Sequence, residues 1–219
     1  MAAANYYSAV QKAYIAFYGR PADKVGLEYW AGQLNTANGN LSTIINAFGT
    51  STEALALFGS QTDTVAINSL YQQLFGRSAD VEGLVYYGTE LAAGRMTLVD
   101  IAQRIADGAT GSDATIIANK LTVAQSFTDA MDTADEILNY AGTAAATVAR
   151  TFLSGVTADT ATVTTATAAI PATLTSIVTV GSATTSAGST FTLTTTADNF
   201  TGTANNDTFN GDITTLNVA

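Results

Sequence analysis

Cysteine and histidine are both absent from this chain of 219 residues, and only 12% of its residues are charged. These absences exclude disulfide bonds, thiol nucleophiles, cysteine or histidine zinc sites and catalysis by imidazole. Lysine and arginine together occur only 8 times, against 18 acidic residues, and no basic residue follows Arg150. A surface that binds nucleic acid needs clustered basic residues, so the net charge of −10 argues against nucleic acids and anionic membranes as partners. Because the common catalytic side chains are missing, we do not expect an enzyme.

Signals for export and for membrane insertion are missing as well. The first residues, Met-Ala-Ala-Ala-Asn-Tyr-Tyr, contain neither the basic nor the apolar segment of a Sec signal peptide. No run of about 18 apolar residues is evident, which predicts that no segment inserts into a membrane. The hydrophobic fraction of 47% is nevertheless that of an ordered protein with a sizeable core.

One segment of the chain occurs twice. Residues 14–30 read Tyr-Ile-Ala-Phe-Tyr-Gly-Arg-Pro-Ala-Asp-Lys-Val-Gly-Leu-Glu-Tyr-Trp, and residues 71–87 repeat this pattern at an offset of 71 − 14 = 57 positions. The equivalent positions include Tyr14 and Tyr71, Gly19 and Gly76, Arg20 and Arg77, Asp23 and Asp80, and Gly26 and Gly83. Self-similarity at a fixed spacing indicates a duplicated structural unit, whose copies bury their apolar faces against their neighbours.

Each copy is predicted to form a helix, a tight turn and a second helix. Before the turn, apolar residues recur at helical spacing and give each first helix an apolar stripe. Gly19 and Gly76 are predicted to end these helices in the left-handed conformation, and Asp23 and Asp80 to cap the helices that follow. The buried positions of the second helices are then Leu27, Trp30 and Leu34 in the first copy, and Leu84, Tyr87 and Leu91 in the other.

These patterns predict a mainly α protein, a multi-helix domain over residues 1–175 with repeats at about 5–58 and 62–111. Pro171 is expected to close the helical region, because proline in a helix interior removes a hydrogen bond. Beyond it, residues 176–197 are rich in Thr, Ser and Gly and are predicted to form a linker with a strand over 189–193. Later helices are expected over residues 112–133, 142–153 and 158–169, and helix N-caps at Ser42, Thr50, Asp63 and Thr97.

Residues 198–219 contain a shorter repeat. Asp198-Asn-Phe-Thr-Gly recurs as Asp207-Thr-Phe-Asn-Gly after 207 − 198 = 9 residues, and nine is the period of RTX repeats, which this segment resembles. In RTX-like β-rolls each nonapeptide supplies a turn that binds Ca²⁺ through carbonyls and an aspartate, and then a short strand. The resemblance implies a Ca²⁺ site formed by Asp198, Asn205, Asp207 and Asp212. We expect this site to be weak, because only one turn is intact, and we expect the repeats to continue beyond Ala219.

The duplicated segment resembles the repeat, catalogued only as a domain of unknown function, that opens many bacterial surface-layer and RTX-type secreted proteins. The core of that repeat reads Phe-x-Gly-Arg-x-x-Asp-x-x-Gly-Leu-x-Tyr-Trp, and the second copy departs from it at Leu74, Ser78 and Tyr87. The resemblance covers residues 1–135 and continues more faintly to about 175. A helical N-terminus followed by a linker and RTX-like turns is similar to the surface-layer proteins of Caulobacter-like bacteria.

This resemblance implies a surface-layer protein of the Gram-negative outer cell surface, exported by type I secretion. The helical domain would hold the lipopolysaccharide O-chain, and Ca²⁺-dependent β-rolls would associate with other copies into a two-dimensional lattice. Two other classes of function stay open from the sequence. One is a type I secreted adhesin that binds host or matrix partners, and the other is a secreted enzyme whose catalytic domain lies beyond Ala219.

Binding of a neutral polysaccharide would need flat aromatic faces and side chains that hydrogen-bond to hydroxyl groups. Helical spacing places Trp30 and Tyr87 largely in the core, so their neighbours Tyr29 and Tyr86 are predicted to face outward. The alternative is that the aromatic cluster of the repeats is simply core. The candidate polysaccharide-binding residues are Tyr29, Tyr86, Tyr18, Asn35, Asn38 and Asn40.

Two groups of charged residues also allow alternatives. Arg20 and Arg77 could grip an acid group of a ligand, or they could compensate helix dipoles and pair with the aspartates of the motif. A second group could bind Ca²⁺ or act as acid and base on a sugar bond, or form a solvated helix face and cap. Its members are Asp129, Asp132, Asp135 and Glu136. We favour the structural interpretation in both cases.

Overall fold

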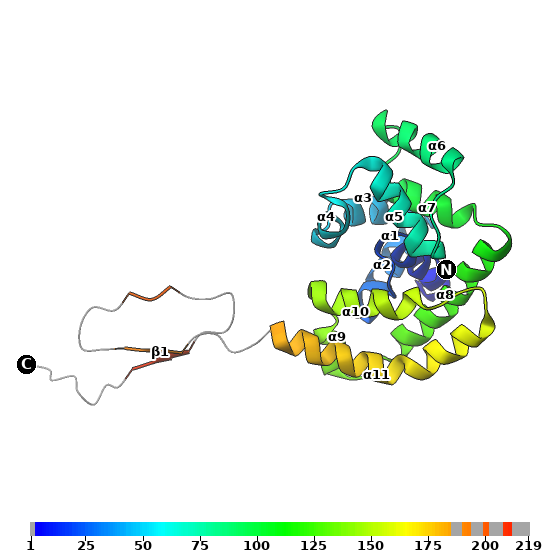
Figure 1. Ribbon diagram of the computed structural model, residues 1–219. Coiled ribbons are helices and arrows are strands. Elements are labelled where there is room, and N and C mark those ends of the chain that lie inside the picture. Colours follow the sequence, from blue (N-terminus) through cyan, green and yellow to red (C-terminus); the bar gives the residue numbers. More distant parts are fainter. Residues whose placement is uncertain (1–2, 185–189, 194–198, 202–207, 212–219) are drawn as a thin grey trace, which may run out of the picture.

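The computed structural model describes residues 3–184, 190–193, 199–201 and 208–211. The first repeat forms η1 (Ala3–Tyr6), α1 (Tyr7–Tyr18), α2 (Lys24–Thr36), α3 (Ser42–Gly49) and α4 (Thr52–Phe58). The second repeat forms α5 (Asp63–Phe75), α6 (Val81–Ala92) and α7 (Leu98–Asp107). The later elements are α8 (Gly111–Ala130), α9 (Ala134–Asn139), α10 (Gly142–Ser154), α11 (Thr160–Thr184), β1 (Thr190–Thr192) and β2 (Thr208–Asn210) (Figure 1). The prediction of a mainly α, multi-helix protein is therefore confirmed.

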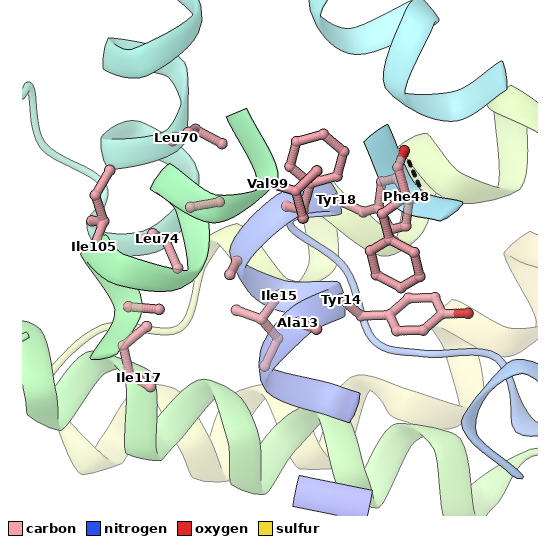
Figure 2. Close-up of a cluster of buried hydrophobic side chains, with 14 of the residues drawn as sticks. Ala13, Tyr14, Ile15, Tyr18, Phe48, Leu70, Leu74, Val99, Ile105 and Ile117 are labelled. Carbon is pink, nitrogen blue, oxygen red and sulfur yellow. Dashed lines mark hydrogen bonds between the residues drawn. The ribbon is translucent and has the colours of Figure 1, made fainter. Parts of the chain in front are cut away.

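Helix α1 lies at the centre of the helical part of the protein (Figure 1). Its apolar residues are distributed around most of its circumference, so it is covered by neighbouring helices on most sides. Figure 2 shows Ile15 directed toward Leu74 of α5, with Tyr14 and Tyr18 on the side of Phe48 of α3. The ring centroids of Tyr14 and Tyr18 lie 4.9 Å and 4.5 Å from that of Phe48. Helix α1 therefore joins the two repeats into one core.

The repeated motif forms the turn between the two helices of each copy, as predicted. Gly19 and Gly76 follow α1 and α5 with φ of 68° and 70°, the left-handed conformation that glycine adopts without strain. The carboxylates of Asp23 and Asp80 accept hydrogen bonds from the backbone N–H of the third residue of α2 and α6, each at 2.6 Å. These two predictions are confirmed in both copies.

A further contact shared by the two copies was not predicted. The side-chain oxygen of Gln11 accepts a hydrogen bond from the N–H of Ala22, and that of Asn68 accepts one from Ala79, both at 3.0 Å. These residues are equivalent at the offset of 57, since 11 + 57 = 68 and 22 + 57 = 79. The equivalence is hidden in the sequence because the two residue types differ, although both supply an amide oxygen.

Helix N-caps were predicted less well than turns. Thr97 caps α7 as expected, in a capping box with Asp100. Three other predicted caps are wrong by one residue, since the N-cap positions are Leu41 before α3, Ser51 before α4 and Thr62 before α5. Ser and Thr adjoin one another at the second of these positions and Thr adjoins Asp at the third, and neighbouring capping residues are hard to rank from residue type alone.

Helix α6 is less buried than predicted. In α2, Leu27 and Leu34 are buried and Trp30 is partly buried, but no residue of α6 is fully buried. Its three predicted core positions are only partly buried; they are Leu84, Tyr87 and Leu91. The reason is that η1 packs across α2, whereas α6 packs mainly on α5.

Helix α11 corrects two expectations. It does not stop at Pro171 but continues to Thr184 with the proline inside it. The helix is retained because Ile170, Leu174 and Ile177 keep helical spacing across the proline and are buried against α8, α9 and α10. Thr167, whose carbonyl would have accepted the missing proline bond, is exposed, so water can satisfy that carbonyl.

The second expectation corrected by α11 is that no segment is long and apolar enough to cross a membrane. Thr160–Ser182 meets both criteria by length and composition, with a mean hydropathy of 1.4 and 17% of the window buried. The segment is hard to recognise in the sequence because it is built from Thr, Ala and Val rather than from an unbroken run of apolar residues. Several threonine hydroxyls of α11 are satisfied within the helix, since they donate to the carbonyl four residues earlier, as in Thr165 to Ala161 and Thr173 to Ala169.

Lys120 of α8 is a charged residue in the core. Its side chain is 2% exposed, and its Nζ donates to the carbonyl oxygen of Gln73 at 2.6 Å, near the C-terminus of α5. Burial lowers the pKa of the Lys120 ammonium from 10.5 to about 8. The unfolded chain keeps this amine protonated to higher pH, so between the two values it binds more protons than the folded chain. Stability therefore rises with pH in this window.

We expect the free energy of unfolding to increase by about 2 kcal/mol between pH 8 and about pH 9.5, and Lys120→Met to remove that increase. Urea titrations at each pH measure the difference between the two proteins. The comparison stops below pH 10, because burial raises the pKa of Tyr18 and Tyr140 to about 12. Above pH 10 these tyrosines ionise more readily in the unfolded chain, which lowers the free energy of unfolding. Lys12→Met, which changes a partly exposed lysine paired with Asp107, should retain the increase. Equal slopes for Lys120→Met and the parent chain would contradict the prediction.

Strands β1 and β2 form a parallel pair. Thr190, Phe191 and Thr192 lie opposite Thr208, Phe209 and Asn210 in register. The offset is 209 − 191 = 18 residues, which is twice the nine-residue period. The strand expected over 189–193 is therefore present as β1.

Candidate functional site

The outward-facing aromatic residues of the two repeats occupy equivalent positions on α2 and α6. Tyr29 and Tyr86 leave 56% and 52% of their surface exposed, whereas Trp30 and Tyr87 beside them are partly buried. In each pair the rings meet edge to face, with centroids 4.9 Å apart in α2 and 5.0 Å apart in α6. The inner ring thus supports the outer ring, which presents an exposed aromatic surface.

Tyr86 borders a cleft of about 590 Å³, which we call the Tyr86 cleft. Its walls come from α3, α6 and α7, and they consist of Ile45, Tyr86, Tyr87, Asp100, Gln103, Arg104, Asp107 and Gly108. The polar residues of α7 stand at positions 100, 103, 104 and 107, a spacing that places them on one face of the helix. The cleft therefore combines an aromatic surface with carboxylate, amide and guanidinium groups.

Some polar groups of the Tyr86 cleft already have hydrogen-bond partners within the protein, and others do not. Asp107 accepts hydrogen bonds from Lys12 of α1 and from Gln103. Partial burial opposes ionisation of this carboxyl, but the two hydrogen bonds outweigh it and hold the pKa of Asp107 below its usual value. Asp100 is engaged in the cap of α7. Arg104 forms no ion pair within the described residues, so its guanidinium is available to a ligand.

The first repeat offers different chemistry around Tyr29. At the offset of 57, the polar positions of α7 correspond to Thr43, Asn46, Ala47 and Thr50, none of which is charged. Of the asparagines predicted to help Tyr29, Asn35 lies in the last turn of α2 and the other two follow its end, and none of them lines the Tyr86 cleft. Asn38 is exposed with φ of 51°, and Asn35 is half-buried. The oxygen of Asn40 already accepts from the N–H and the hydroxyl of Ser42, at 2.9 Å and 2.6 Å.

Tyr18 cannot bind a polysaccharide in this structure, and its assignment to the site is corrected. Only 4% of its surface is exposed, because it packs between α3 and α4 in the core. Its hydroxyl lies 2.9 Å from Oγ of Ser51, and burial raises its pKa to about 12. Helical spacing predicts the exposure of Tyr29 because α2 has a side that faces solvent. Tyr18 is buried because neighbouring helices cover α1 at that position.

The two motif arginines are engaged in ion pairs, but not with the motif aspartates. Arg20 binds both oxygens of Glu53 at 2.8 Å and 2.7 Å, and Arg77 binds Asp113 at 2.7 Å. The predicted pairing with the aspartates of the motif is wrong, because those carboxylates accept from the amides of α2 and α6. Each guanidinium also lies over the ring of the motif tyrosine, 5.2 Å from Tyr14 and 5.3 Å from Tyr71.

The acidic residues at and after the end of α8 form caps and a solvated face. Glu136 and Thr133 make a capping box at the start of α9, and the backbone N–H of Thr133 lowers the pKa of the Glu136 carboxyl. Asp129 accepts from Gln125 at 2.8 Å on the surface of α8. Within the described residues, no group of three or more acidic side chains is arranged to hold a metal ion.

The predicted Ca²⁺ ligands Asp198, Asn205, Asp207 and Asp212 lie outside the described residues. The described strands nevertheless fit a roll built from nine-residue units. The 18-residue offset of β1 and β2 makes one coil from two such units, and Phe200 stands midway between Phe191 and Phe209. The rings of Phe191 in β1 and of Phe200, which lies outside both strands, have centroids 4.8 Å apart.

Sequence analysis missed the α7 side of the site. The residues in question, Asp100, Gln103, Arg104 and Asp107, carry a detectable signal, since they recur at 3 and 4 residue intervals opposite the buried Val99, Ile101 and Ile105. What the sequence does not show is that α6 and α7 face each other across a cleft, so that this polar face meets Tyr86.

Comparison with known proteins gives one family match. The model of a domain of unknown function (DUF4214) matches the chain twice, over residues 4–58 and 48–109. The two matches cover the two repeats, which is consistent with the duplicated domain of unknown function that the motif indicates. No curated protein and no solved structure matches the chain.

Proposed function

We propose that this chain is the cell-anchoring part of a surface-layer protein and that its helical domain binds polysaccharide, namely the O-chain of lipopolysaccharide. The observation that carries the proposal is the Tyr86 cleft, where an exposed aromatic ring adjoins amide, guanidinium and carboxylate groups. An aromatic face packs against the C–H side of a pyranose, and the polar groups of α7 hydrogen-bond to its hydroxyls.

The charge of the protein favours the outer polysaccharide over the lipid end of the molecule. A chain with a net charge of −10 is repelled by the phosphates of lipid A and the inner core unless divalent cations bridge them. The Tyr86 cleft carries two carboxylates and one guanidinium, so it does not select a strongly anionic ligand. Neutral or weakly charged sugars of the O-chain meet neither penalty.

We expect Tyr86→Ala to weaken binding to smooth lipopolysaccharide at least about tenfold, because it removes the exposed aromatic face. Co-sedimentation of the full chain with smooth and with O-chain-deficient lipopolysaccharide measures the effect. Tyr86→Trp should retain binding, and Val85→Ala, which alters a residue on the same helix that is 64% exposed, should leave it unchanged. Binding should persist in about 1 M salt, which screens charge-driven contacts.

Three results would refute the assignment to the Tyr86 cleft. The first is unchanged co-sedimentation of a folded Tyr86→Ala protein. The second is equal binding to smooth and O-chain-deficient lipopolysaccharide, which would place the contact on the lipid or inner core. The third is loss of binding in high salt. Tyr29→Ala should have a smaller effect than Tyr86→Ala, because the first repeat has no charged residues at the equivalent positions.

We propose in addition that the C-terminal repeats bind Ca²⁺ and that lattice formation on the outer cell surface depends on it. The support is the 18-residue register of β1 and β2 together with the nine-residue sequence period. We expect Ca²⁺ to slow amide exchange of residues 190–211, and Asp207→Asn to remove that protection while leaving α1 to α11 unaffected. Equal exchange in Ca²⁺ and in chelator, measured in a protein with further repeats, would contradict the proposal.

A further inference from the structure

A second cavity lies between α4 and the start of α10, and none of its residues lines the Tyr86 cleft. Its volume is about 250 Å³, many times the roughly 30 Å³ that one water molecule occupies in the liquid. The charged and hydrogen-bonding residues of its wall are Arg20, Thr52, Glu53, Tyr140, Thr143 and Arg150. We call it the Arg150 pocket.

The Arg150 pocket concentrates positive charge in an acidic protein. Its wall contains two guanidinium groups and one carboxylate, a net charge of +1, although the chain carries −10. Glu53 is shared, since Arg150 donates to the same carboxylate at 2.8 Å that Arg20 binds with two nitrogens. The side chains of Arg20 and Arg150 are only 11% and 18% exposed, so this charge is weakly screened by solvent.

Arg150 retains hydrogen-bond donors for a ligand. One of its terminal nitrogens binds Glu53, and the other donates to the hydroxyl of Thr147 at 3.2 Å. No acceptor for its Nε–H is found within residues 3–184. All three nitrogens of Arg20, by contrast, already donate to Glu53 or to the carbonyl of Pro21, and aromatic rings lie around the guanidinium. Arg150 is therefore the residue positioned to bind an anion.

The start of α10 adds to the same electrostatic field. Gly142 and Thr143 line the pocket, and the N-cap residue Ala141 has no side-chain acceptor for the first amides of the helix. The first turn of α10 also contains no acidic residue. The positive end of this 13-residue helix thus faces the cavity beside Arg150.

The second repeat shows that the motif alone does not build such a pocket. Its arginine, Arg77, is paired one to one with Asp113, and 44% of the Arg77 side chain is exposed. Tyr140 and Arg150, which complete the pocket over the first repeat, come from the segment at and after the end of α9. The difference between the repeats indicates that Arg150, from a later helix, adds a second positive charge to the ion pair of Arg20 and Glu53 in the first repeat.

We infer that the Arg150 pocket binds a monoanionic carboxylate on a small polar molecule, of the class of the sugar acids. A guanidinium edge and a helix N-terminus match a carboxylate, and one negative charge balances the net charge of the wall. A phosphate dianion would add a charge beyond that balance next to Glu53. The hydroxyls of Thr52 and Thr143 at the pocket wall provide partners for the hydroxyls of a sugar acid. This inference does not rest on polysaccharide binding at the Tyr86 cleft.

Titration of the ¹⁵N-labelled full chain with galacturonate tests the inference. We expect saturable shifts at Gly142, Thr143 and the Arg150 Nε–H, with a Kd of about 1 mM or tighter. Arg150→Gln should weaken the affinity at least about tenfold, while Glu53 keeps its partner Arg20 and the fold is preserved. Arg77→Gln, which changes the motif arginine of the second repeat, and Tyr86→Ala should leave the affinity unchanged.

Other probes and a second variant decide the remaining outcomes. Ala56→Leu narrows the exposed rim of the pocket without changing its charge and should also abolish the shifts, which keeps the test decisive if Arg150→Gln fails to fold. Equal binding of galactose, stronger binding of inorganic phosphate, or galacturonate binding that survives both variants would overturn the inference. Acetate binding as tight as galacturonate would overturn the assignment to sugar acids, because the hydroxyl groups of the sugar would then contribute nothing to the affinity.

Discussion

Glu53→Gln will lower the free energy of unfolding by about 3 kcal/mol, although it changes only one atom of a side chain outside the apolar core. Glu53 is the carboxylate shared by Arg20 and Arg150, and the three side chains are only 22%, 11% and 18% exposed. Without the carboxylate, two guanidinium groups remain close together with little water to solvate them. The loss is therefore the cost of burying unpaired charge rather than the strength of one hydrogen bond.

Chemical denaturation of the parent and variant proteins measures this loss. Glu90→Gln is the matched control, because its partner Arg95 is 57% exposed and solvent screens such a surface pair, so this variant should be nearly as stable as the parent. A chloride or carboxylate salt should restore part of the stability of Glu53→Gln by occupying the place of the missing carboxylate. If Glu53→Gln is as stable as Glu90→Gln, the charged group of Glu53, Arg20 and Arg150 is well solvated and does not constrain the fold.

The helical repeats were predictable because their determinants are local. Glycine at the end of α1 and α5, aspartate before α2 and α6, and apolar residues at helical spacing each act within a few positions of the chain. The end of α11 was not predictable in this way. Pro171 gives a local signal to stop, but burial of Ile170, Leu174 and Ile177 against three other helices outweighs it.

The candidate sites also contain features that are set by local sequence and features that depend on distant residues. Exposure of Tyr29 and Tyr86 follows from helical spacing alone, and the structure shows both side chains on the surface. The different environments of the two motif arginines do not follow from any local feature, since their surrounding motifs are nearly the same. Arg150 reaches Glu53 across 97 positions and Tyr140 reaches the carbonyl of Pro21 across 119 positions, and such contacts appear only once the chain is folded.

Gly26→Ala will destabilise the protein, whereas Gly32→Ala in the same helix will stabilise it. Glycine to alanine in a helix interior is normally favourable by up to about 1 kcal/mol, and nothing lies within 4 Å of a Cβ added at Gly32. A Cβ at Gly26 would instead collide with the hydroxyl of Tyr14 and with the carboxylate of Asp23 at 2.6 Å. Relieving that overlap means displacing a core tyrosine or the helix cap, so we expect a loss of about 1–3 kcal/mol.

The second repeat provides an independent copy of this experiment. A Cβ at Gly83 would lie 2.7 Å from the hydroxyl of Tyr71, and nothing lies within 4 Å of one at Gly88. Gly83→Ala and Gly88→Ala should therefore differ in the same direction, by less than the first pair because Tyr71 sits on a more exposed helix pair. Tyr14→Phe should recover part of the stability lost in Gly26→Ala, because it removes the atom that the new methyl group meets. If Gly26→Ala and Gly32→Ala change the free energy of unfolding equally, contact with the tyrosine is not the reason why this motif has glycine at position 26.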